Sequence, residues 1–468
     1  MRNPTWSERR RGSVVQRASG PGRVLFVGHE ATRTGAPVMF LHFLRWLRAN
    51  TDLDFEVLLL NGGPLADEYA EVAPLTVVPA LGKGRRSYFE GGLARAGFPR
   101  AADRTKVLRN RRALRHMQGF DALYLNSTTS ALALRVLPEI PPLVLSHVHE
   151  LDSAFTYWFP QRDRDIMLAA THRFIACAQA VSRHLIGARG VPGTQVACHY
   201  EFIEPPVPDP MRAAELRRSL GIPASARIVG GAGQAIWRKA PDLFIQTAAR
   251  LRDRRPDLDV HFVWVGEVDN GRMPVQLDIE RMGLTDRVHF VGEVRDPADL
   301  FSTFDVFCLP SREDPYPLVM LETASLGVPV VAFANGGVVE FAGLHDQGVE
   351  PRAVIVPYLD VGALTDSIAE LFDDEGRRIA IGRRGQDRVL TEHTVEIGAK
   401  SLYEELLHAM ANPPGTPVAI DSTDLPGTAT RASGPPQATI IDLLSPDPSP
   451  VAPHPPLNQE KDSEWQLS

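Results

Sequence analysis

The stretch from Asp305 to Glu340 constrains the fold of this chain more than any other, because two short apolar runs in it alternate with two helix starts. Val306 to Leu309 is expected to form a buried strand, and Pro317 suits the first turn of the helix that follows. A second buried strand, Val330 to Phe333, leads through a glycine turn into another helix start. Two strand–loop–helix units in succession predict a parallel sheet, which binds ligands at the carboxyl ends of its strands.

The polar groups of this stretch suit a ligand that carries both phosphate and hydroxyl groups. Two helix N-termini at one crevice would offer free backbone N–H groups and partial positive charge to a phosphate. Three carboxylates stand beside them, and carboxylates accept hydrogen bonds from sugar hydroxyls: Glu313, Asp314 and Glu322. A pocket for both kinds of group predicts a nucleotide sugar as the ligand.

The same stretch resembles the signature of the retaining glycosyltransferases of family 4 (group 1). In that family an acidic residue and a Glu, separated by seven residues, bracket the donor sugar and the ribose; here the pair is Asp314 and Glu322. The family usually carries Glu at the first position, so either the shorter side chain of Asp314 serves or the neighbouring Glu313 contributes. The helix start between them belongs to the same predicted donor site: Pro317, Leu318 and Val319.

The resemblance implies an α/β chain with the GT-B fold, in which two Rossmann-like, doubly wound domains face a cleft. It extends from about Arg23 to Met410. Residues 23–205 would form the acceptor domain, and residues 206–411 the nucleotide-sugar donor domain, whose final helix would return to the first domain. Residues 1–22, a basic leader without an apolar core, and the Pro-rich residues 412–468 have the composition of disordered tails.

In the first domain the resemblance assigns roles to two loops. Gly35 and Ala36 follow the first predicted strand and would reach the donor phosphates across the cleft. His149, in the run HVHE after another strand, would lie near the transferred sugar, with His147 as the alternative. Two histidines one residue apart, without a third ligand at a recognisable spacing, do not predict a metal site.

In the second domain a lysine stands where a helix begins. Lys239 precedes Pro241, and an ammonium beside a helix N-terminus makes sense when an anion binds there too. Gly231-Ala232-Gly233 does not complete a dinucleotide fingerprint, because Ile236 occupies the third glycine position. The resemblance assigns phosphate binding to Lys239, with Arg238 assisting, and contact with the nucleotide base to the backbone near Val291.

Composition limits the class of protein. A hydrophobic content of 44% and a charged content of 23% are typical of a soluble globular protein, and the formal net charge of −7 argues against a generally basic nucleic-acid binder. Three cysteines fit no disulfide framework, and no apolar run approaches the length of a membrane span, so a cytoplasmic location is expected. The basic run Lys83 to Arg115, with aromatic residues interleaved, suits a solvated helical hairpin or a contact with the acceptor or a membrane surface.

The sequence therefore predicts a retaining glycosyltransferase that moves a sugar from a nucleoside-diphosphate donor to a hydroxyl acceptor. Lys239, Asp314 and His149 would carry the catalysis, without a metal ion or other cofactor. Suitable acceptors are a lipid-linked, cell-envelope or exopolysaccharide glycan, reached by peripheral contact with the inner face of the membrane. Two alternatives stay open: a sugar-nucleotide epimerase of the same fold, and a non-catalytic nucleotide-sugar-binding subunit.

Overall fold

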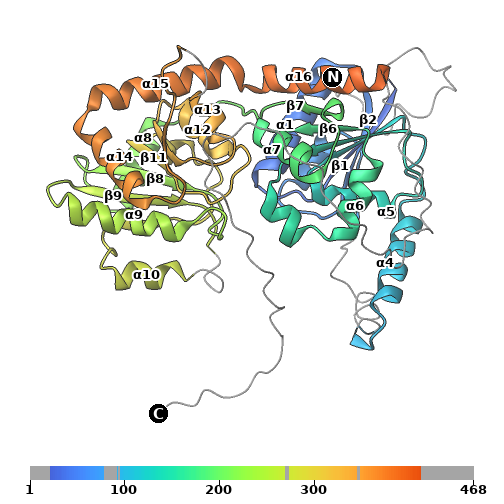
Figure 1. Ribbon diagram of the computed structural model, residues 1–468, viewed down its shortest axis with the longest axis horizontal. Helices are drawn as coiled ribbons and strands as arrows, with labels where there is room; N and C mark the ends of the chain where they lie inside the picture. Colours follow the sequence, from blue (N-terminus) through green and yellow to red (C-terminus); the bar gives the residue numbers. More distant parts are fainter. Residues whose placement is uncertain (1–21, 79–91, 93–94, 269–273, 345–347, 413–468) are drawn as a thin grey trace, which may run out of the picture. The chain divides into compact units, whose positions relative to one another are not determined.

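The computed structural model describes residues 22–78, 92, 95–268, 274–344 and 348–412, and it contains two parallel β-sheets flanked by helices (Figure 1). Apart from Gly22 and Asn412, the two predicted tails lie outside the described residues. Residues 83–91 and 93–94 of the basic run also lie outside them.

The first sheet has seven strands in the order β3-β2-β1-β4-β5-β6-β7, and each neighbouring pair is parallel. We call this sheet and its helices the N-terminal half. Strands that are covered on both faces need continuous apolar runs, and β1, β4 and β5 are buried along almost their whole length. The strands are β1 (Arg23–Gly28), β2 (Asp54–Leu59), β3 (Leu75–Val77), β4 (Ala122–Asn126), β5 (Leu143–Val148), β6 (Arg173–Ala176) and β7 (Val196–Cys198).

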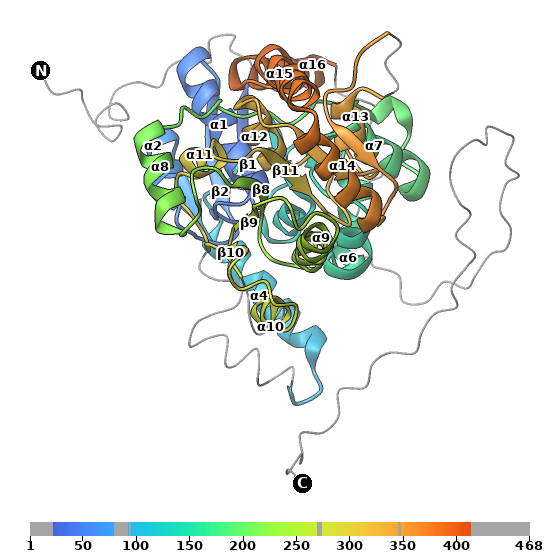
Figure 2. The same cartoon turned by 90° about the vertical axis from the view of Figure 1, so that its left-hand side faces the viewer.

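The second sheet, in the C-terminal half, has six parallel strands in the order β10-β9-β8-β11-β12-β13, part of which is seen end on in Figure 2. The strands are β8 (Arg227–Ala232), β9 (Val260–Val265), β10 (Val288–Phe290), β11 (Val306–Leu309), β12 (Val330–Phe333) and β13 (Val354–Val356). Both strand orders reverse in the middle of the sheet, so the predicted doubly wound topology is confirmed.

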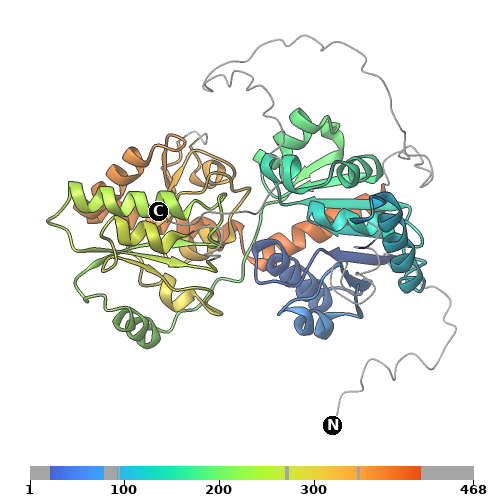
Figure 3. The same cartoon turned by 90° about the horizontal axis from the view of Figure 1, so that it is seen from below.

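Helices cover both faces of each sheet. In Figure 3 the helices α1 and α2 (blue) and α6 and α7 (green) lie on opposite sides of the first sheet. The helices of the N-terminal half are α1 (Gly35–Asn50), α2 (Ala66–Val72), α4 (Pro99–Ala113), η2 (Thr128–Leu132), α5 (Ala133–Val136), η3 (Ala154–Trp158), α6 (Gln161–Ala170), α7 (Gln179–Arg183), η4 (His184–Ala188) and η5 (Gly193–Gln195). The later helices are α8 (Pro210–Ser219), α9 (Pro241–Arg254), α10 (Val275–Arg281), α11 (Ala298–Phe301), α12 (Leu318–Ser325), α13 (Val338–Ala342), α14 (Val361–Asp373), α15 (Glu375–Glu392) and α16 (Val395–Ala411).

The final helix, α16, packs on the N-terminal half (Figure 1). Its buried residues Ala399, Leu402, Leu406 and Ala409 recur at helical spacing and form one apolar stripe. At its start, Trp46 Nε1 of α1 donates a hydrogen bond to a carboxylate oxygen of Glu396 at 2.8 Å. Within the described residues no helix is both long and apolar enough to cross a membrane.

The strand order places a crevice at each switch point. β1 lies beside β4 in the first sheet, and β8 lies beside β11 in the second. The loops that leave these neighbours turn to opposite faces of the sheet and so open a gap between them. The chain after β1, β4, β8 and β11 is therefore where ligand-binding groups are expected.

Candidate functional site

A cavity of about 1040 Å³ opens at these strand ends and is lined by both halves of the chain. Its volume suits a ligand of nucleotide-sugar size. Eleven of the predicted site residues line it: Gly35, Ala36, His149, Arg238, Lys239, Glu313, Asp314, Pro317, Leu318, Val319 and Glu322. The structure thus brings together side chains from segments that are far apart in the sequence.

Val291 is the predicted residue that does not line the cavity. It is the first residue after β10, its backbone N–H donates to the Trp264 carbonyl at 3.0 Å, and it packs against the core. The chain reaches the cavity two residues later, at Glu293 and Val294. Contact between the backbone near Val291 and the nucleotide base stays a prediction.

Lys239 and Arg238 both pair with the carboxylate of Asp314. Lys239 Nζ lies 2.6 Å from Asp314 Oδ2, and one Arg238 guanidinium nitrogen lies 3.1 Å from Oδ1. Burial alone would raise the pKa of Asp314, but the two cations and a hydrogen bond from Ser311 lower it below the usual value. Asp314 is therefore an anion, and in this arrangement it serves as the counter-ion of the two cations.

The glycine turn predicted after β12 fixes the backbone of Asp314. Asn335 Oδ1 accepts from the Asp314 N–H at 3.3 Å, and Asn335 Nδ2 donates to the Ser311 carbonyl at 2.6 Å. Gly336 has a φ of +58°, and a Cβ there would stand 1.9 Å from the Asp314 carbonyl oxygen. Only glycine allows the two loops to approach this closely.

The glycine that resembles part of a dinucleotide motif makes room for the lysine. Gly233 has a φ of +128°, and a Cβ there would lie 3.1 Å from the side-chain carbons of Lys239. Burial lowers the pKa of Lys239, an effect that the charge of Asp314 opposes. Gly233 therefore supports the position of the ammonium and not a dinucleotide.

Glu322 is a carboxylate of the cavity without a side-chain partner among the described residues. It lies in the second turn of α12, and none of the described residues forms a hydrogen bond or an ion pair with its side chain. Burial raises the pKa of Glu322 to about 7, although the nearby Lys239 opposes this shift. Such a group accepts hydrogen bonds from a ligand without first losing a protein partner.

Glu313, the alternative to Asp314, points across the cavity to the N-terminal half. Its two carboxylate oxygens accept from the Ser153 backbone N–H at 3.1 Å and from the Ser153 hydroxyl at 2.5 Å. Ser153 directly precedes the helical turn η3, so Glu313 satisfies a free N–H at that helix start. Both acidic candidates for the first position of the motif are thus already engaged.

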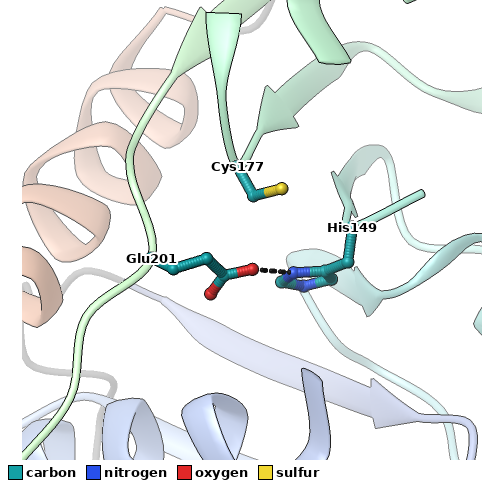
Figure 4. A group of neighbouring side chains, drawn as sticks. All are labelled: His149, Cys177 and Glu201. Atoms are coloured by element: carbon teal, nitrogen blue, oxygen red, sulfur yellow. Dashed lines mark hydrogen bonds and ion pairs between the residues drawn. The ribbon is translucent and has the colours of Figure 1, made fainter. Parts of the chain in front are cut away.

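His149 is held by hydrogen bonds at both ring nitrogens. Nδ1 lies 2.6 Å from a carboxylate oxygen of Glu201, as Figure 4 shows, and Nε2 lies 2.9 Å from the side-chain oxygen of Asn126. His147 does not line the cavity; it is buried, and its Nδ1 bonds the Tyr124 hydroxyl at 2.8 Å. Of the two predicted histidines, His149 is therefore the one that faces the cavity.

The same place contains the one group of side chains, among the described residues, whose types and spacing could hold a metal ion. Single donor atoms of His149, Cys177 and Glu201 all lie within 4.8 Å of one another (Figure 4). The hydrogen bond between Glu201 and His149 already occupies Nδ1 of the ring and one carboxylate oxygen, two atoms that could otherwise bind a metal ion. We assign the pair as a hydrogen-bonded ion pair, with the buried Cys177 packed beside it.

Sequence reasoning did not find Glu201 or Glu150. Glu150 accepts hydrogen bonds from the backbone N–H groups of Thr128 and His149, and Glu201 binds His149 from a segment without a motif. The only local signal for Glu150 was its place in the run HVHE. Burial of Glu201, which identifies it in the structure, has no signature in one sequence.

Comparison with known proteins gives a family match to one part of the chain. Residues 226–374 match the model of the glycosyl transferases group 1. The lipopolysaccharide core biosynthesis mannosyltransferase LpsB of Rhizobium meliloti (strain 1021) is 29% identical over 205 residues, which cover 42% of this chain and 57% of the relative. A D-inositol 3-phosphate glycosyltransferase of Corynebacterium urealyticum is 31% identical over 210 residues, or 43% and 48% of the two chains. The chain thus spans about half the length of the curated relatives it matches.

Solved structures extend the likeness in fold to most of the chain. HepE of Anabaena, solved with UDP and glucose, superposes with a TM-score of 0.65 at 19% identity and covers 82% of this chain and 99% of its own. Sucrose-phosphate synthase from Thermosynechococcus elongatus has a TM-score of 0.63 at 19% identity, with 83% and 100% covered. The chain therefore has the predicted GT-B fold, and its residues 226–374 match the glycosyl transferases group 1.

Proposed function

We propose that this protein is a retaining glycosyltransferase that uses a nucleoside-diphosphate sugar and needs no metal ion. The anomeric bond to the diphosphate would break, the acceptor hydroxyl oxygen would bond to the anomeric carbon, and the hydroxyl proton would leave with the diphosphate. The observation that carries the proposal is one cavity in which Lys239, Arg238 and the unpaired carboxylate of Glu322 face the N-terminus of α1.

The positive side of the cavity suits the diphosphate. α1 is 16 residues long, and its N-cap, Thr34, makes no side-chain capping bond, so the first backbone N–H groups stay available to an anion. An ammonium has three donors, of which Asp314 receives one from Lys239. The remaining donors would stabilise the charge of the departing diphosphate, commonly the largest catalytic contribution.

The other end of the cavity suits hydroxyl groups. The carboxylate of Glu322 would accept hydrogen bonds from the two ribose hydroxyls, and its lack of a partner among the described residues supports this role. Asp314 would act on the donor sugar only through an oxygen lone pair that its cation contacts leave open. In this proposal His149 lies on the acceptor side of the donor sugar.

The positions of two Asp-x-Asp pairs support a reaction without a metal ion. Asp52 and Asp54 stand before or at the start of β2, and Asp257 and Asp259 stand before β9, so they lie at the strand ends away from the cavity. Asp54, Asp257 and Asp259 each pair with an arginine. The cations Lys239 and Arg238 would supply the charge that a metal provides in other transferases.

The acceptor would be a glycan, in keeping with relatives named for lipopolysaccharide core and inositol phosphate glycosylation. The exposed side of α4 favours a lipid-linked one at the inner face of the membrane. There the side chain of Leu108 is 64% exposed, with exposed Arg104 and Arg112 nearby on the same helix. Asp103 of α4 pairs with Arg135 and Arg162, which fixes the helix to the N-terminal half.

A donor screen followed by product analysis tests the proposal. Thermal shifts with UDP-, GDP- and ADP-sugars identify the donor, and anomeric NMR of the product establishes its stereochemistry. Transfer to a glycan with retention, unchanged by EDTA, is expected. Epimerised donor formed without an acceptor would support the epimerase instead, and binding without any donor hydrolysis would support a non-catalytic subunit.

A further inference from the structure

A chain of hydrogen bonds joins Glu201 to the loop at the start of α1. Glu201 lies 2.6 Å from His149 Nδ1, and His149 Nε2 lies 2.9 Å from Asn126 Oδ1. Asn126 Nδ2 in turn donates to the Ala36 carbonyl at 3.2 Å. A buried carboxylate of one segment is thus connected through three side-chain contacts to a residue that lines the donor cavity.

The direction of each hydrogen bond follows from the groups at the two ends. The Ala36 carbonyl can only accept, so the amide nitrogen of Asn126 must face it and the amide oxygen must face His149. That oxygen accepts a proton from Nε2, and the carboxylate of Glu201 accepts one from Nδ1. Both ring nitrogens therefore carry hydrogen, and His149 is an imidazolium cation.

The surroundings of the ring agree with this assignment. The titratable groups that face His149 are Glu201, Glu150, His147, His29 and Cys177. Burial alone would lower the pKa of His149, but Glu201 and then Glu150 raise it above the ordinary value. Burial lowers the pKa of His29 and of His147, so the charge of this cluster resides on His149.

While Glu201 is ionised, only the charged form of His149 makes both ring contacts attractive. A neutral ring protonated at Nε2 would turn its Nδ1 lone pair toward the carboxylate of Glu201. A neutral ring protonated at Nδ1 would turn its Nε2 lone pair toward the oxygen of Asn126. If Asn126 then flipped its amide, its oxygen would face the Ala36 carbonyl. Each of these arrangements contains one repulsion between two acceptors, and in the flipped one Ala36 loses its hydrogen bond.

We propose that Glu201 is a positioning residue of the donor site: it keeps His149 protonated, and the imidazolium holds the Gly35–Ala36 turn through Asn126. This inference rests on the proposed function, because it gives that turn a role in donor binding. The turn lies close to the C-terminal half, since a methyl group added at Gly35 would stand 3.6 Å from the side chain of Leu318. A displaced turn would therefore disturb both walls of the cavity.

NMR of histidine-labelled protein tests the charge directly, without requiring activity. The His149 signal is assigned by its loss in His149→Gln, and the ¹⁵N shifts of the ring report protonation at each nitrogen. We expect both nitrogens to be protonated at neutral pH, and the pKa of His149 to fall in Glu201→Gln, because the carboxylate that raises it is lost. The exposed Glu204→Gln, in the same segment, should leave the signal unchanged. A neutral His149 in the wild type would overturn the proposal, as would zinc bound in stoichiometric amount.

Titration with UDP-glucose tests the consequence. At pH 8, Glu201→Gln should bind it about tenfold more weakly than the wild type at the same pH, as a charge-assisted contact is replaced by a neutral one. At pH 6 the ring of the variant is closer to its lowered pKa than at pH 8, so the ratio of the two affinities should be smaller there. If the variant were simply misfolded, lowering the pH would not restore its affinity. Equal affinities at both pH values would overturn the positioning role, whereas wild-type protein that binds no nucleotide sugar would count against the proposed function and leave the NMR result standing.

Discussion

Ser153 and Glu313 join the two halves of the chain across the cavity: the backbone N–H and the hydroxyl of Ser153 donate to the two oxygens of Glu313 at 3.1 and 2.5 Å. A second carboxylate makes the same kind of contact, because Glu340 accepts from the backbone N–H groups of Gln179 and Ala180 at 2.8 and 2.6 Å. Each acid follows a strand of the second sheet, and each accepts hydrogen bonds from free backbone N–H groups at the start of a helix in the N-terminal half. Carboxylates that receive backbone N–H groups thus connect the two halves at two places.

We predict that Glu313→Ala combined with Glu340→Ala loosens this connection. Each change removes a capping carboxylate, which is worth about 0.5–2 kcal/mol. The melting temperature should fall, and small-angle X-ray scattering should give a larger radius of gyration. The exposed Glu350→Ala is the matched control and should change neither quantity. A double variant as compact as the control would show that other contacts hold the halves together.

We predict that Lys239→Ala weakens binding of UDP-glucose, or of the nucleotide sugar that the screen selects, by about 1.5–3 kcal/mol, the value of a hydrogen bond to a charged group. Arg238 still pairs with Asp314 in this variant, so the fold should persist. Calorimetric titration measures the affinity, and circular dichroism checks the fold. Lys400→Ala, an exposed lysine on α16, should bind like the wild type. If Lys239→Ala binds the nucleotide sugar as tightly as the wild type, the phosphates must bind elsewhere in the cavity.

The fold could be predicted because its signals are local. The buried strands are continuous apolar runs, and Pro317 and Gly327 mark the two ends of α12, where Gly327 has a φ of +78°. β7 was not predicted, since it is a three-residue edge strand whose residues are all only partly buried. A strand this short carries no pattern that distinguishes it from a loop.

The candidate site was predicted as far as its motifs reach. Residues carried by the resemblance line the cavity, except Val291, which stands two residues before the cavity-lining Glu293. What the sequence could not give are the partners of those residues. Ser153 and Glu313 are 160 residues apart, and His149 and Glu201 are 52 residues apart. Contacts at such separations arise from the packing of the sheets and leave no periodicity behind.

We predict that affinity for UDP-glucose rises with pH through about 7, the pKa that burial gives Glu322. The sign follows from the ligand: ribose hydroxyls donate to the ionised carboxylate, so binding favours loss of its proton, and the diphosphate of a nucleotide sugar does not titrate in this range. Glu322→Gln should bind more weakly and without this pH dependence. A variant that retains the wild-type pH profile would assign the titration to another group.

We predict that His393 makes the fold sensitive to acid. The ring is fully buried, bonded to Tyr316 and to the Glu201 carbonyl, and burial lowers its pKa to about 4. Because the folded pKa lies below the unfolded value of about 6.5, the neutral ring contributes stability above pH 6.5 that is lost as the pH falls toward 4. The loss is on the order of 3 kcal/mol. Urea unfolding of His393→Asn should show a smaller decrease over this range than the wild type, and an equal decrease would contradict the assignment.

We predict that α4 binds anionic membranes. Arg104 and Arg112 are exposed one helical turn on either side of the exposed Leu108, and Arg115 is exposed just after α4. Each basic residue near an anionic bilayer contributes about 1 kcal/mol. Sedimentation with vesicles should therefore increase with their content of anionic lipid and decrease with salt, because ions screen the attraction.

The matched variants separate this surface from total charge. Changing Arg104, Arg112 and Arg115 to Glu should abolish sedimentation, and Arg111 is left in place because its side chain bonds the Arg135 carbonyl. Changing three exposed arginines of the C-terminal half, Arg218, Arg250 and Arg281, alters the net charge equally and should leave binding intact. Equal loss in both triple variants would mean that overall charge, and not α4, governs attachment. Binding that ignores lipid charge and salt would leave α4 as a solvated helix, and the acceptor would then have to be sought in solution.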